Sequence, residues 1–178
     1  DKYYQEGGLD NLPESVQNNE ALVDALTDAR TEELYKMWYN PVVTDTYEPG
    51  STFKLMNVAT AYELGVVHAE DTFYCGGSMM VGDWKEPIKC HNTNGHGSQT
   101  LTQAVMNSCN VAMMQIVAKT GRERFYDFFK AFGMNSRTGI DLPNESPGIF
   151  FDVEDSTSWN EVSLAVSSFG QRFQVTPI

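Results

Sequence analysis

The segment from Ser51 to Leu64 constrains the fold more than any other part of this sequence. Eight apolar residues cover nearly the whole circumference of the helix that it predicts, and Gly65 follows at a position that suits a helix C-terminus. Such a helix is stable when other elements surround most of its surface. We therefore predict a central helix over residues 51–64, packed by its neighbours. Its apolar residues are Phe53, Leu55, Met56, Val58, Ala59, Ala61, Tyr62 and Leu64.

Length and composition limit the partners of this chain. A chain of 178 residues fits one domain that can bury roughly 70% of its unfolded surface. Hydrophobic residues make up 41% of it and charged residues 20%, as in a globular protein. The net charge of −12, without a basic cluster, disfavours a nucleic-acid partner. The longest apolar stretch, 111–118, is too short to span a bilayer. The chain begins without Met or a signal peptide, so we expect it to be a piece of a longer protein.

Periodic apolar residues predict further helices along the chain. Between residues 20 and 40 we expect two short helices, the second starting at Thr31 and stopped by Pro41. Thr100 and Gln103 match a capping box at the start of a helix that runs to about Asn107. Further helices are expected over 111–119, 122–132 and 160–169, and at most a small hairpin over 73–90.

Ser51 and Lys54 are three residues apart at the start of the predicted central helix, so their side chains emerge on one face. A serine hydroxyl becomes a useful nucleophile when a base takes its proton, and a lysine amine can do so only in its neutral form. Lowering the lysine pKa from about 10.4 toward 7 requires about 4–5 kcal/mol, which burial and the helix N-terminus can supply together. The backbone N–H of Ser51 can stabilise an oxyanion. The pair predicts an acyl-serine site.

A second polar pair, Ser108 and Asn110, lies between two predicted helices. A tight turn there would place a hydroxyl and an amide in a cleft, where they could relay a proton and bind substrate. Ser158-Trp159-Asn160 has the same pattern, but it lies in an irregular acidic stretch and we assign it to helix capping. The pair Ser51 and Lys54 alone is a weak signal, because a Ser-x-x-Lys spacing often arises by chance.

Several motifs together resemble the transpeptidase domain of class B penicillin-binding proteins, and the resemblance runs from about Tyr35 to Ile178. The segment 35–41 and the pair Cys75 and Cys90 are most similar to the sporulation branch of this family. A set of motifs of this kind is associated with acyl-serine enzymes. The motifs are Tyr47-Glu48-Pro49-Gly50-Ser51-Thr52-Phe53-Lys54, His96-Gly97, Asn107-Ser108-Cys109-Asn110, Phe132-Gly133 and Thr138-Gly139-Ile140-Asp141-Leu142-Pro143.

The resemblance implies a role for each motif residue. Ser51 is the acylated nucleophile, Lys54 its proton acceptor, and Ser108 with Asn110 the second motif, in which Cys109 fills the variable middle position. Such enzymes accept the D-alanyl-D-alanine end of a peptidoglycan stem peptide, form an acyl-enzyme and pass the acyl group to the amine of a neighbouring stem. Penicillins are captured at the same serine. The chemistry needs no cofactor and no metal.

The resemblance also implies a fold and a location. We expect residues 1–178 to be a single partial domain, truncated at both ends: the mainly α, helical part of an α+β penicillin-binding (β-lactamase-like) transpeptidase domain, with most of its central sheet missing. The parent protein would act outside the cytoplasm, anchored to the membrane by a segment outside this chain. Bare apolar surface on the fragment predicts self-association.

The family's third motif, Lys-Thr-Gly, lies on a strand that lines the cleft. The triplet Lys119-Thr120-Gly121 has this sequence, but we expect it to be the end of a helix, with Gly121 at the C′ position. The parent would then be an enzyme and this fragment nearly inert, because losing one oxyanion donor costs about 10²–10³ in rate. Arg172 occupies a position where relatives usually carry glycine, which puts the local backbone conformation in question.

Two questions stay open at the level of sequence. Cys75 and Cys90 could form a disulfide, remain free thiols, or bind zinc together with His91 and His96, although the spacing fits no common zinc finger. The domain could also be a β-lactam-recognising sensor or an inert scaffold in place of a transpeptidase. Acylation and subsequent transfer to an acceptor amine distinguish these functions.

Overall fold

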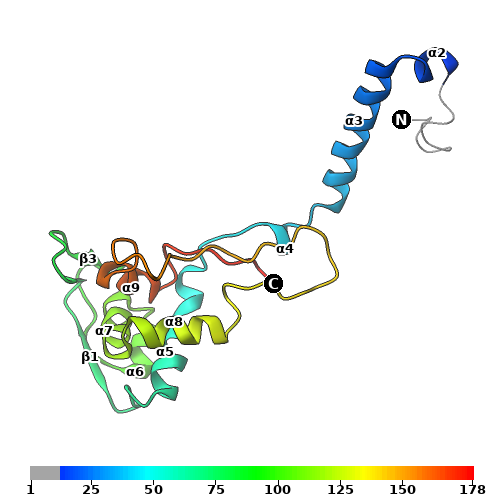
Figure 1. Cartoon of the computed structure of the whole chain (residues 1–178). Helices are drawn as coiled ribbons and strands as arrows, with labels where there is room; N and C mark the ends of the chain where they lie inside the picture. The colour runs from blue at the N-terminus through cyan, green and yellow to red at the C-terminus, as the bar shows by residue number, and fades with distance from the viewer. Residues whose placement is uncertain (1–12) are drawn as a thin grey trace. The chain divides into compact units, whose positions relative to one another are not determined.

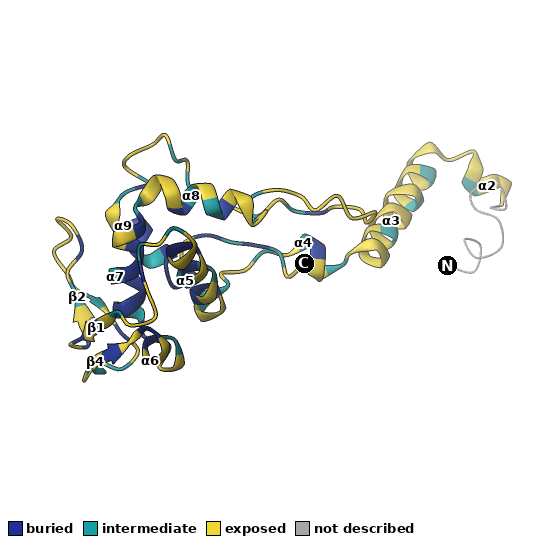
Figure 2. Cartoon of the chain, turned by 90° about the horizontal axis from the view of Figure 1, so that it is seen from below, coloured by how far each residue is buried: buried dark blue, intermediate teal, exposed yellow. Residues whose placement is uncertain are grey.

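The computed structural model describes residues 13–178 and groups the chain into two compact units, residues 1–40 and 41–178. In the first unit, the short helix α2 (Glu14–Gln17) precedes the 19-residue helix α3 (Glu20–Trp38). The Asn19 side chain caps α3 by accepting a hydrogen bond from the Leu22 N–H (3.3 Å). No residue of α3 is buried (Figure 2).

The expectation of two short helices over residues 20–40 is wrong. Thr31 lies inside α3, where its hydroxyl donates to the carbonyl of Thr27 (2.8 Å) instead of capping a new helix. The segment contains no glycine or proline, and Lys36 pairs with Glu32 and Glu33 across one turn, so nothing interrupts the helical hydrogen bonds. The helix ends at Trp38, three residues before Pro41.

The second unit is mainly helical, as predicted. Its elements in chain order are α4 (Pro41–Thr44), the 3₁₀ helix η2 (Gly50–Phe53), α5 (Lys54–Glu63), β1 (Thr72–Cys75), β2 (Ser78–Met79), β3 (Ile88–Lys89), β4 (Gly97–Thr100), α6 (Leu101–Met106), α7 (Asn110–Thr120), α8 (Arg122–Ala131) and α9 (Glu161–Ser167). Figure 1 shows their arrangement. None of the helices that the structure describes has the length and apolarity of a membrane span.

The strands form two antiparallel pairs instead of one small hairpin. β2 pairs with β3, with Ser78 opposite Lys89, inside the region where a hairpin was expected. β1 pairs with the more distant β4, with Cys75 opposite Gly97. The sequence prediction missed this second pair because β4, Gly-Ser-Gln-Thr, has no apolar alternation of the kind that indicates a strand.

The helix boundaries follow local sequence signals. The capping box at the start of α6 is present, with the Gln103 N–H donating to Thr100 Oγ1 (3.2 Å) and the Thr100 N–H donating to Gln103 Oε1 (2.9 Å). Gly121, with φ of 82°, ends α7 and precedes α8. Asn160 caps α9 through the Ser163 N–H (3.0 Å). These termini agree with the sequence prediction.

The helix at the centre of the second unit is α7, not the predicted helix over 51–64. α7 contacts α5, α8, α9, β1 and β3 (Figure 1). Its residue Ile116 belongs to one hydrophobic cluster, and the adjacent Val117 belongs to a second one built around Phe53, Phe129 and Phe173. Because α7 lies between two hydrophobic clusters, most of its apolar residues are buried, and Ala118 near its C-terminus is the exception.

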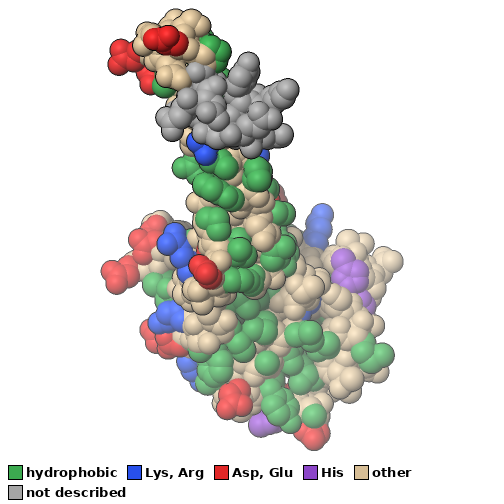
Figure 3. Space-filling model, turned by 90° about the vertical axis from the view of Figure 1, so that its right-hand side faces the viewer, with side chains coloured by type: hydrophobic (Ala, Val, Ile, Leu, Met, Phe, Trp, Pro, Cys, Tyr) green, Lys and Arg blue, Asp and Glu red, His purple; other side chains and the backbone are tan. Residues whose placement is uncertain are grey.

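The prediction that the apolar residues of 51–64 are mostly buried is also wrong. The side chains that α5 buries are Lys54, Asn57, Thr60 and Ala61. Leu55 and Tyr62 keep 62% and 57% of their surface exposed. Hydrophobic side chains are widespread on the face of the molecule drawn in Figure 3. Apolar content alone did not indicate which face of α5 packs against the rest of the unit.

Candidate active site

Lys54 is the centre of the candidate site. It is the first residue of α5 and only 3% exposed. Its Nζ donates hydrogen bonds to the carbonyl oxygen of Ser108 (2.7 Å), to Ser108 Oγ (2.9 Å) and to Asn110 Oδ1 (2.7 Å). The structure thus brings together three of the four predicted site residues, from segments more than fifty positions apart.

Ser51 lies in η2, one turn before Lys54, and is exposed. The first turn is a 3₁₀ helix and not the expected α-helical turn, and in this geometry side chains three residues apart eclipse each other. Among residues 13–178, the Ser51 hydroxyl makes no hydrogen bond, so Ser51 and Lys54 share one face of the helix start without being hydrogen-bonded to each other. A hydroxyl that is exposed and next to the buried amine is accessible to a ligand.

The backbone around Ser51 is fixed by contacts with the segment after α9. The Gly50 N–H donates to the carbonyl of Gly170 (2.8 Å), and a Cβ on Gly170 would collide with the backbone of Gly50. Glu48 Oε1 accepts a hydrogen bond from the Arg172 N–H (2.7 Å). Arg172 has φ of 65°, which explains why glycine suits this position. The segment after α9 therefore holds the turn that precedes Ser51 at two points.

The turn between α6 and α7 presents Ser108 and Asn110 to the lysine. Ser108 has φ of 47°, a left-handed conformation that is uncommon outside glycine and is often found at functional sites. Asn110 is the first residue of α7, and its Nδ2 donates to the carbonyl of Lys89, the last residue of β3 (3.4 Å). Hydrogen bonds on both sides of its amide orient Asn110 between Lys54 and the β2–β3 pair.

The surroundings of Lys54 change its acidity. Burial, which penalises the charged ammonium, lowers the pKa of Lys54 below its ordinary value of 10.5, while the nearby thiols of Cys90 and Cys109 act in the opposite direction. The three acceptors around Nζ match the three protons of an ammonium. When Lys54 loses one proton, the Ser108 hydroxyl can rotate and donate to it, so both protonation states have partners.

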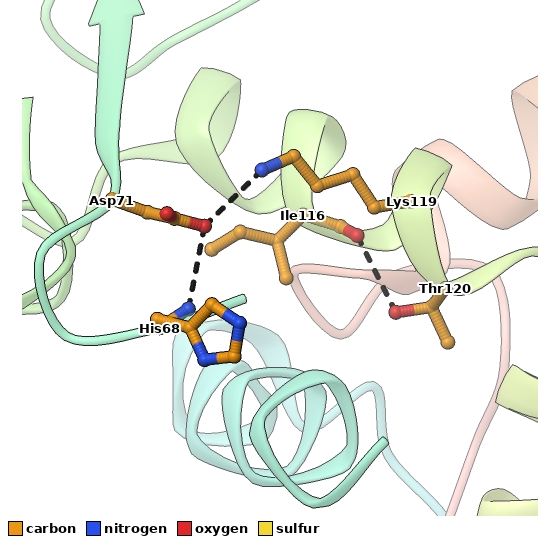
Figure 4. Close-up of polar contacts among 5 residues, drawn as sticks. All are labelled: His68, Asp71, Ile116, Lys119 and Thr120. Carbon is orange, nitrogen blue, oxygen red and sulfur yellow. Dashed lines mark hydrogen bonds and ion pairs between the residues drawn. The ribbon is translucent and has the colours of Figure 1, made fainter. Parts of the chain in front are cut away.

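The triplet Lys119-Thr120-Gly121 does not line this site, as expected. Figure 4 shows Lys119 and Thr120 at the end of α7. Lys119 Nζ pairs with Asp71 Oδ2 (3.3 Å), and the Thr120 hydroxyl donates to the carbonyl of Ile116 (3.3 Å). Asp71 also accepts from the backbone N–H of His68 (3.3 Å). The triplet ends a helix and anchors the loop before β1.

Three cysteines and a histidine cluster beside the turn between α6 and α7, which contributes Cys109. The ligand atoms of Cys75, Cys90, His96 and Cys109 all lie within 4.8 Å of one another, and we call these four residues the cysteine–histidine cluster. Its three cysteines have free thiols. The sequence pattern indicates Cys75, Cys90 and His96 as possible zinc ligands together with His91, which is exposed, and it does not indicate Cys109. No local pattern indicates Cys109, because the α6–α7 turn alone brings it to the cluster.

Comparisons with known proteins match most of the chain. A family model described as the penicillin binding protein transpeptidase domain covers residues 14–178. The chain is 39% identical over 140 residues to stage V sporulation protein D of Bacillus subtilis, covering 78% of this chain and 21% of that protein. It is 30% identical over 139 residues to the penicillin-binding protein PbpB of Mycobacterium tuberculosis, covering 77% of this chain and 19% of that protein.

Solved structures resemble the same part of the chain. Pseudomonas aeruginosa PBP2 in complex with WCK 5153 superposes with a TM-score of 0.72 at 24% identity, covering 78% of this chain and 33% of that one. Penicillin-binding protein 3 of Mycobacterium tuberculosis in complex with aztreonam superposes with a TM-score of 0.68 at 29% identity, covering 77% and 30%. The chain spans about a fifth of the length of the curated relatives it matches.

Proposed function

Because this chain belongs to the penicillin-binding protein transpeptidase domain family, we propose that the protein containing it is a serine-type peptidoglycan D,D-transpeptidase. The cross-linking of stem peptides outside the cytoplasm by a membrane-anchored parent is part of this proposal. The similarity to stage V sporulation protein D supports a role in sporulation. The single observation that carries the proposal is the buried Lys54 amine, hydrogen-bonded to Ser108 and Asn110 and one turn from Ser51.

The proposed reaction begins at Ser51. Neutral Lys54 takes the proton from Ser51 Oγ as this oxygen attacks the carbonyl carbon of the terminal D-alanyl-D-alanine bond. The backbone N–H of Ser51 stabilises the oxyanion of the tetrahedral intermediate. The C–N bond then breaks, and the leaving amine of D-alanine receives a proton through Ser108 Oγ.

The second half of the reaction restores the enzyme. The amine of a neighbouring stem peptide attacks the acyl-ester carbon and loses a proton to Lys54. The ester C–O bond breaks and Ser51 Oγ regains its proton, so a new peptide bond joins the two stems. Asn110 binds the substrate amide in both halves. A β-lactam acylates Ser51 in the first half, and a relative in complex with aztreonam supports this part of the proposal.

Residues 1–178 by themselves are proposed to form one incomplete transpeptidase domain that is nearly inert. The Lys-Thr-Gly triplet occurs once in the sequence, and its position at the end of α7 prevents it from acting as a cleft strand. Without that strand the domain would lack a carboxylate site and one oxyanion donor, which alone costs about 10²–10³ in rate. A β-lactam sensor or an inert scaffold remains the alternative for the whole protein.

A fluorescent penicillin tests the proposed nucleophile. In the full-length protein we expect covalent labelling that peptide mapping assigns to Ser51 and that Ser51→Ala abolishes. Ser158→Ala is a matched control, because Ser158 belongs to the other Ser-x-Asn pattern and its hydroxyl donates to the carbonyls of Asp152 and Asp155 in the loop before α9. Labelling that persists in Ser51→Ala would show that another residue is the nucleophile. Deacylation by an acceptor amine then distinguishes a transpeptidase from a sensor.

A further inference from the structure

The stretch that leads to Ser51 runs antiparallel to the segment after α9. Tyr47 and Val175 form an antiparallel bridge, in which the N–H of each residue donates to the carbonyl of the other (3.0 Å). In a regular antiparallel ladder the next hydrogen-bonded pair would be Pro49 and Phe173, two residues further along each stretch. Pro49 has no N–H, so the regular ladder stops there. The backbone just before Ser51 therefore depends on other contacts for its position.

The Glu48 side chain supplies a contact that the interrupted ladder lacks. Its Oε1 accepts a hydrogen bond from the Arg172 N–H (2.7 Å), across 124 positions of the chain. A carboxylate acceptor makes a stronger hydrogen bond with an N–H than a neutral carbonyl does. Two residues from each partner, the Gly50 N–H donates to the carbonyl of Gly170 (2.8 Å). The side-chain bond of Glu48 therefore fills the interval between the antiparallel bridge and the Gly50 bond.

The backbone conformation of Arg172 makes this hydrogen bond important. Among residues 13–178, only Ser108, Asn144 and Arg172 have a positive φ without being glycine, and φ of Arg172 is 65°. This left-handed conformation is unfavourable for a residue with a Cβ, whereas glycine adopts it readily. The Arg172 guanidinium lies over the ring of Phe151 (5.6 Å to its centroid) and forms no ion pair with Glu48. The carboxylate therefore acts on the Arg172 backbone and not on its charged group.

We propose that Glu48 is a positioning residue for Ser51. By holding Arg172 in its left-handed conformation, Glu48 keeps the backbone of Gly170 against Gly50 and so orients the nucleophile that follows Gly50. The two glycines are packed so closely that a Cβ on Gly170 would collide with the backbone N, C and O atoms of Gly50. A displacement of Gly170 is therefore passed directly to Gly50. The inference rests on the proposed function, in which Ser51 is acylated.

The position of Gly50 should affect the rate of acylation more than the reversible binding of a β-lactam. One peptide unit separates the Gly50 N–H, which is hydrogen-bonded to Gly170, from the Ser51 N–H, which is the proposed oxyanion donor. An oxyanion donor works only when it is aligned with the oxygen of the tetrahedral intermediate. Reversible binding also uses Asn110, which Lys54 and the β3 backbone hold independently of Glu48. Loss of the Glu48 bond should therefore act mainly on the chemical step.

Acylation kinetics of the full-length protein with a fluorescent penicillin test the role of Glu48. Glu48→Ala should slow the acylation step by about 10–100-fold, the cost of a small misplacement of a reacting group. The dissociation constant of the reversible complex should change by less than about threefold. Glu48→Gln keeps an acceptor oxygen for the Arg172 N–H, so it should acylate at least about fivefold faster than Glu48→Ala. Glu70→Ala, at an exposed glutamate between α5 and β1, is the matched control and should acylate normally.

A second substitution at position 172 distinguishes positioning from a general effect on stability. Arg172→Gly removes the penalty of the left-handed conformation, so Glu48→Ala with Arg172→Gly should acylate at least about fivefold faster than Glu48→Ala alone. Asn144→Gly is the matched control, because Asn144 also has a left-handed backbone, with φ of 63°, and is exposed in a different loop. Asn144→Gly should not restore acylation to Glu48→Ala, whereas a general gain in stability would come from either glycine.

Amide hydrogen exchange tests the Glu48 bond without reference to acylation. In Glu48→Ala, peptides that cover residues 47–53 and 169–175 should exchange faster, while α7 keeps its protection. Unchanged exchange in these peptides would overturn the proposal.

Two kinetic results would also overturn the proposed role of Glu48. Folded Glu48→Ala could acylate at the normal rate, or Arg172→Gly could fail to restore acylation. Absence of labelling in the unmodified protein would instead count against the proposed function. Circular dichroism shows whether each variant folds, and Glu48→Asp, whose shorter side chain places the carboxylate out of reach of the Arg172 N–H, replaces Glu48→Ala if that variant does not fold.

Discussion

Helices α5 and α7 pack against each other, yet they bury opposite kinds of side chain. Among the residues that α7 buries are Met113, Ile116 and Val117, and nearly all of its buried side chains are apolar. The residues that α5 buries are mostly polar, while Leu55 and Tyr62 on the same helix are exposed. Both helices contain enough apolar residues to predict a buried helix. Hydrophobicity therefore did not decide which face of each helix is inside.

The difference follows from what each buried side chain meets. α7 lies between two hydrophobic clusters, which bury most of its apolar side chains. α5 meets the backbone and N-terminus of α7, where Lys54 finds its three acceptors and Asn57 Nδ2 donates to the carbonyl of Met113 (3.2 Å). A buried polar group is stable when it is hydrogen-bonded. These hydrogen bonds stabilise the orientation in which α5 buries its polar face.

Of the substitutions that test this difference between α5 and α7, replacing the buried amine of Lys54 should have the largest effect, which is on the acylation rate. Lys54→Met keeps the length of the side chain, and we expect acylation by a fluorescent penicillin to slow by about 10²–10⁴-fold, as for the loss of a general base. Lys85→Met, at an exposed lysine, should acylate at the normal rate. Equal rates for Lys54→Met and the unmodified protein would remove Lys54 from the mechanism.

The pH dependence of the same variant adds a second readout. Burial lowers the pKa of Lys54, so the neutral base and the acylation rate should rise with pH below 10.5, the ordinary lysine value. Between the lowered pKa and 10.5 the unfolded chain binds more protons than the folded one, so the free energy of unfolding should rise with pH. In the Lys54→Met variant this rise in the free energy of unfolding with pH should be absent, as measured by urea denaturation at several pH values.

The apolar side of the contrast is tested in α7. Ile116 is completely buried in the first hydrophobic cluster. Ile116→Ala removes buried methyl and methylene groups and leaves a cavity, so the free energy of unfolding should fall by about 2–5 kcal/mol in urea denaturation. A loss below about 0.5 kcal/mol would show that α7 is not packed between two clusters in solution.

The polar side of α5 should contribute less to stability. Asn57→Ala removes the hydrogen bond to the carbonyl of Met113 from a fully buried position. We expect a loss of about 1–3 kcal/mol in the free energy of unfolding, the cost of a broken buried hydrogen bond. Asn94→Ala, at an exposed position, provides the control. An unchanged stability for Asn57→Ala would indicate that the polar face is not held by this bond.

The exposed apolar face of α5 should give the smallest change in stability. Leu55→Ser combined with Tyr62→Ser should change the free energy of unfolding by no more than about 0.5 kcal/mol per residue, because both side chains are exposed. The same pair should reduce the proposed self-association of residues 1–178 in sedimentation experiments. A monomeric unmodified fragment under the same conditions contradicts self-association.

Local signals in the sequence were sufficient for much of the site and of the helices. The capping box of α6, the Gly121 terminus of α7 and the three-residue spacing of Ser51 and Lys54 depend on neighbours in the chain. Such features are readable because capping and helical periodicity involve residues within one or two turns. The Lys-Thr-Gly triplet at 119–121 is also readable from local sequence, because Gly121 indicates the end of a helix.

Tertiary structure decided the features that depend on distant partners. The sequence by itself indicated the candidate residues for acyl-serine chemistry and determined where most helices begin and end. Only the folded chain decided that α5 buries its polar face, that β1 pairs with β4, and that Cys109 meets Cys75. Burial and ligand convergence are set by the sum of long-range contacts, and no periodicity within one segment contains that information.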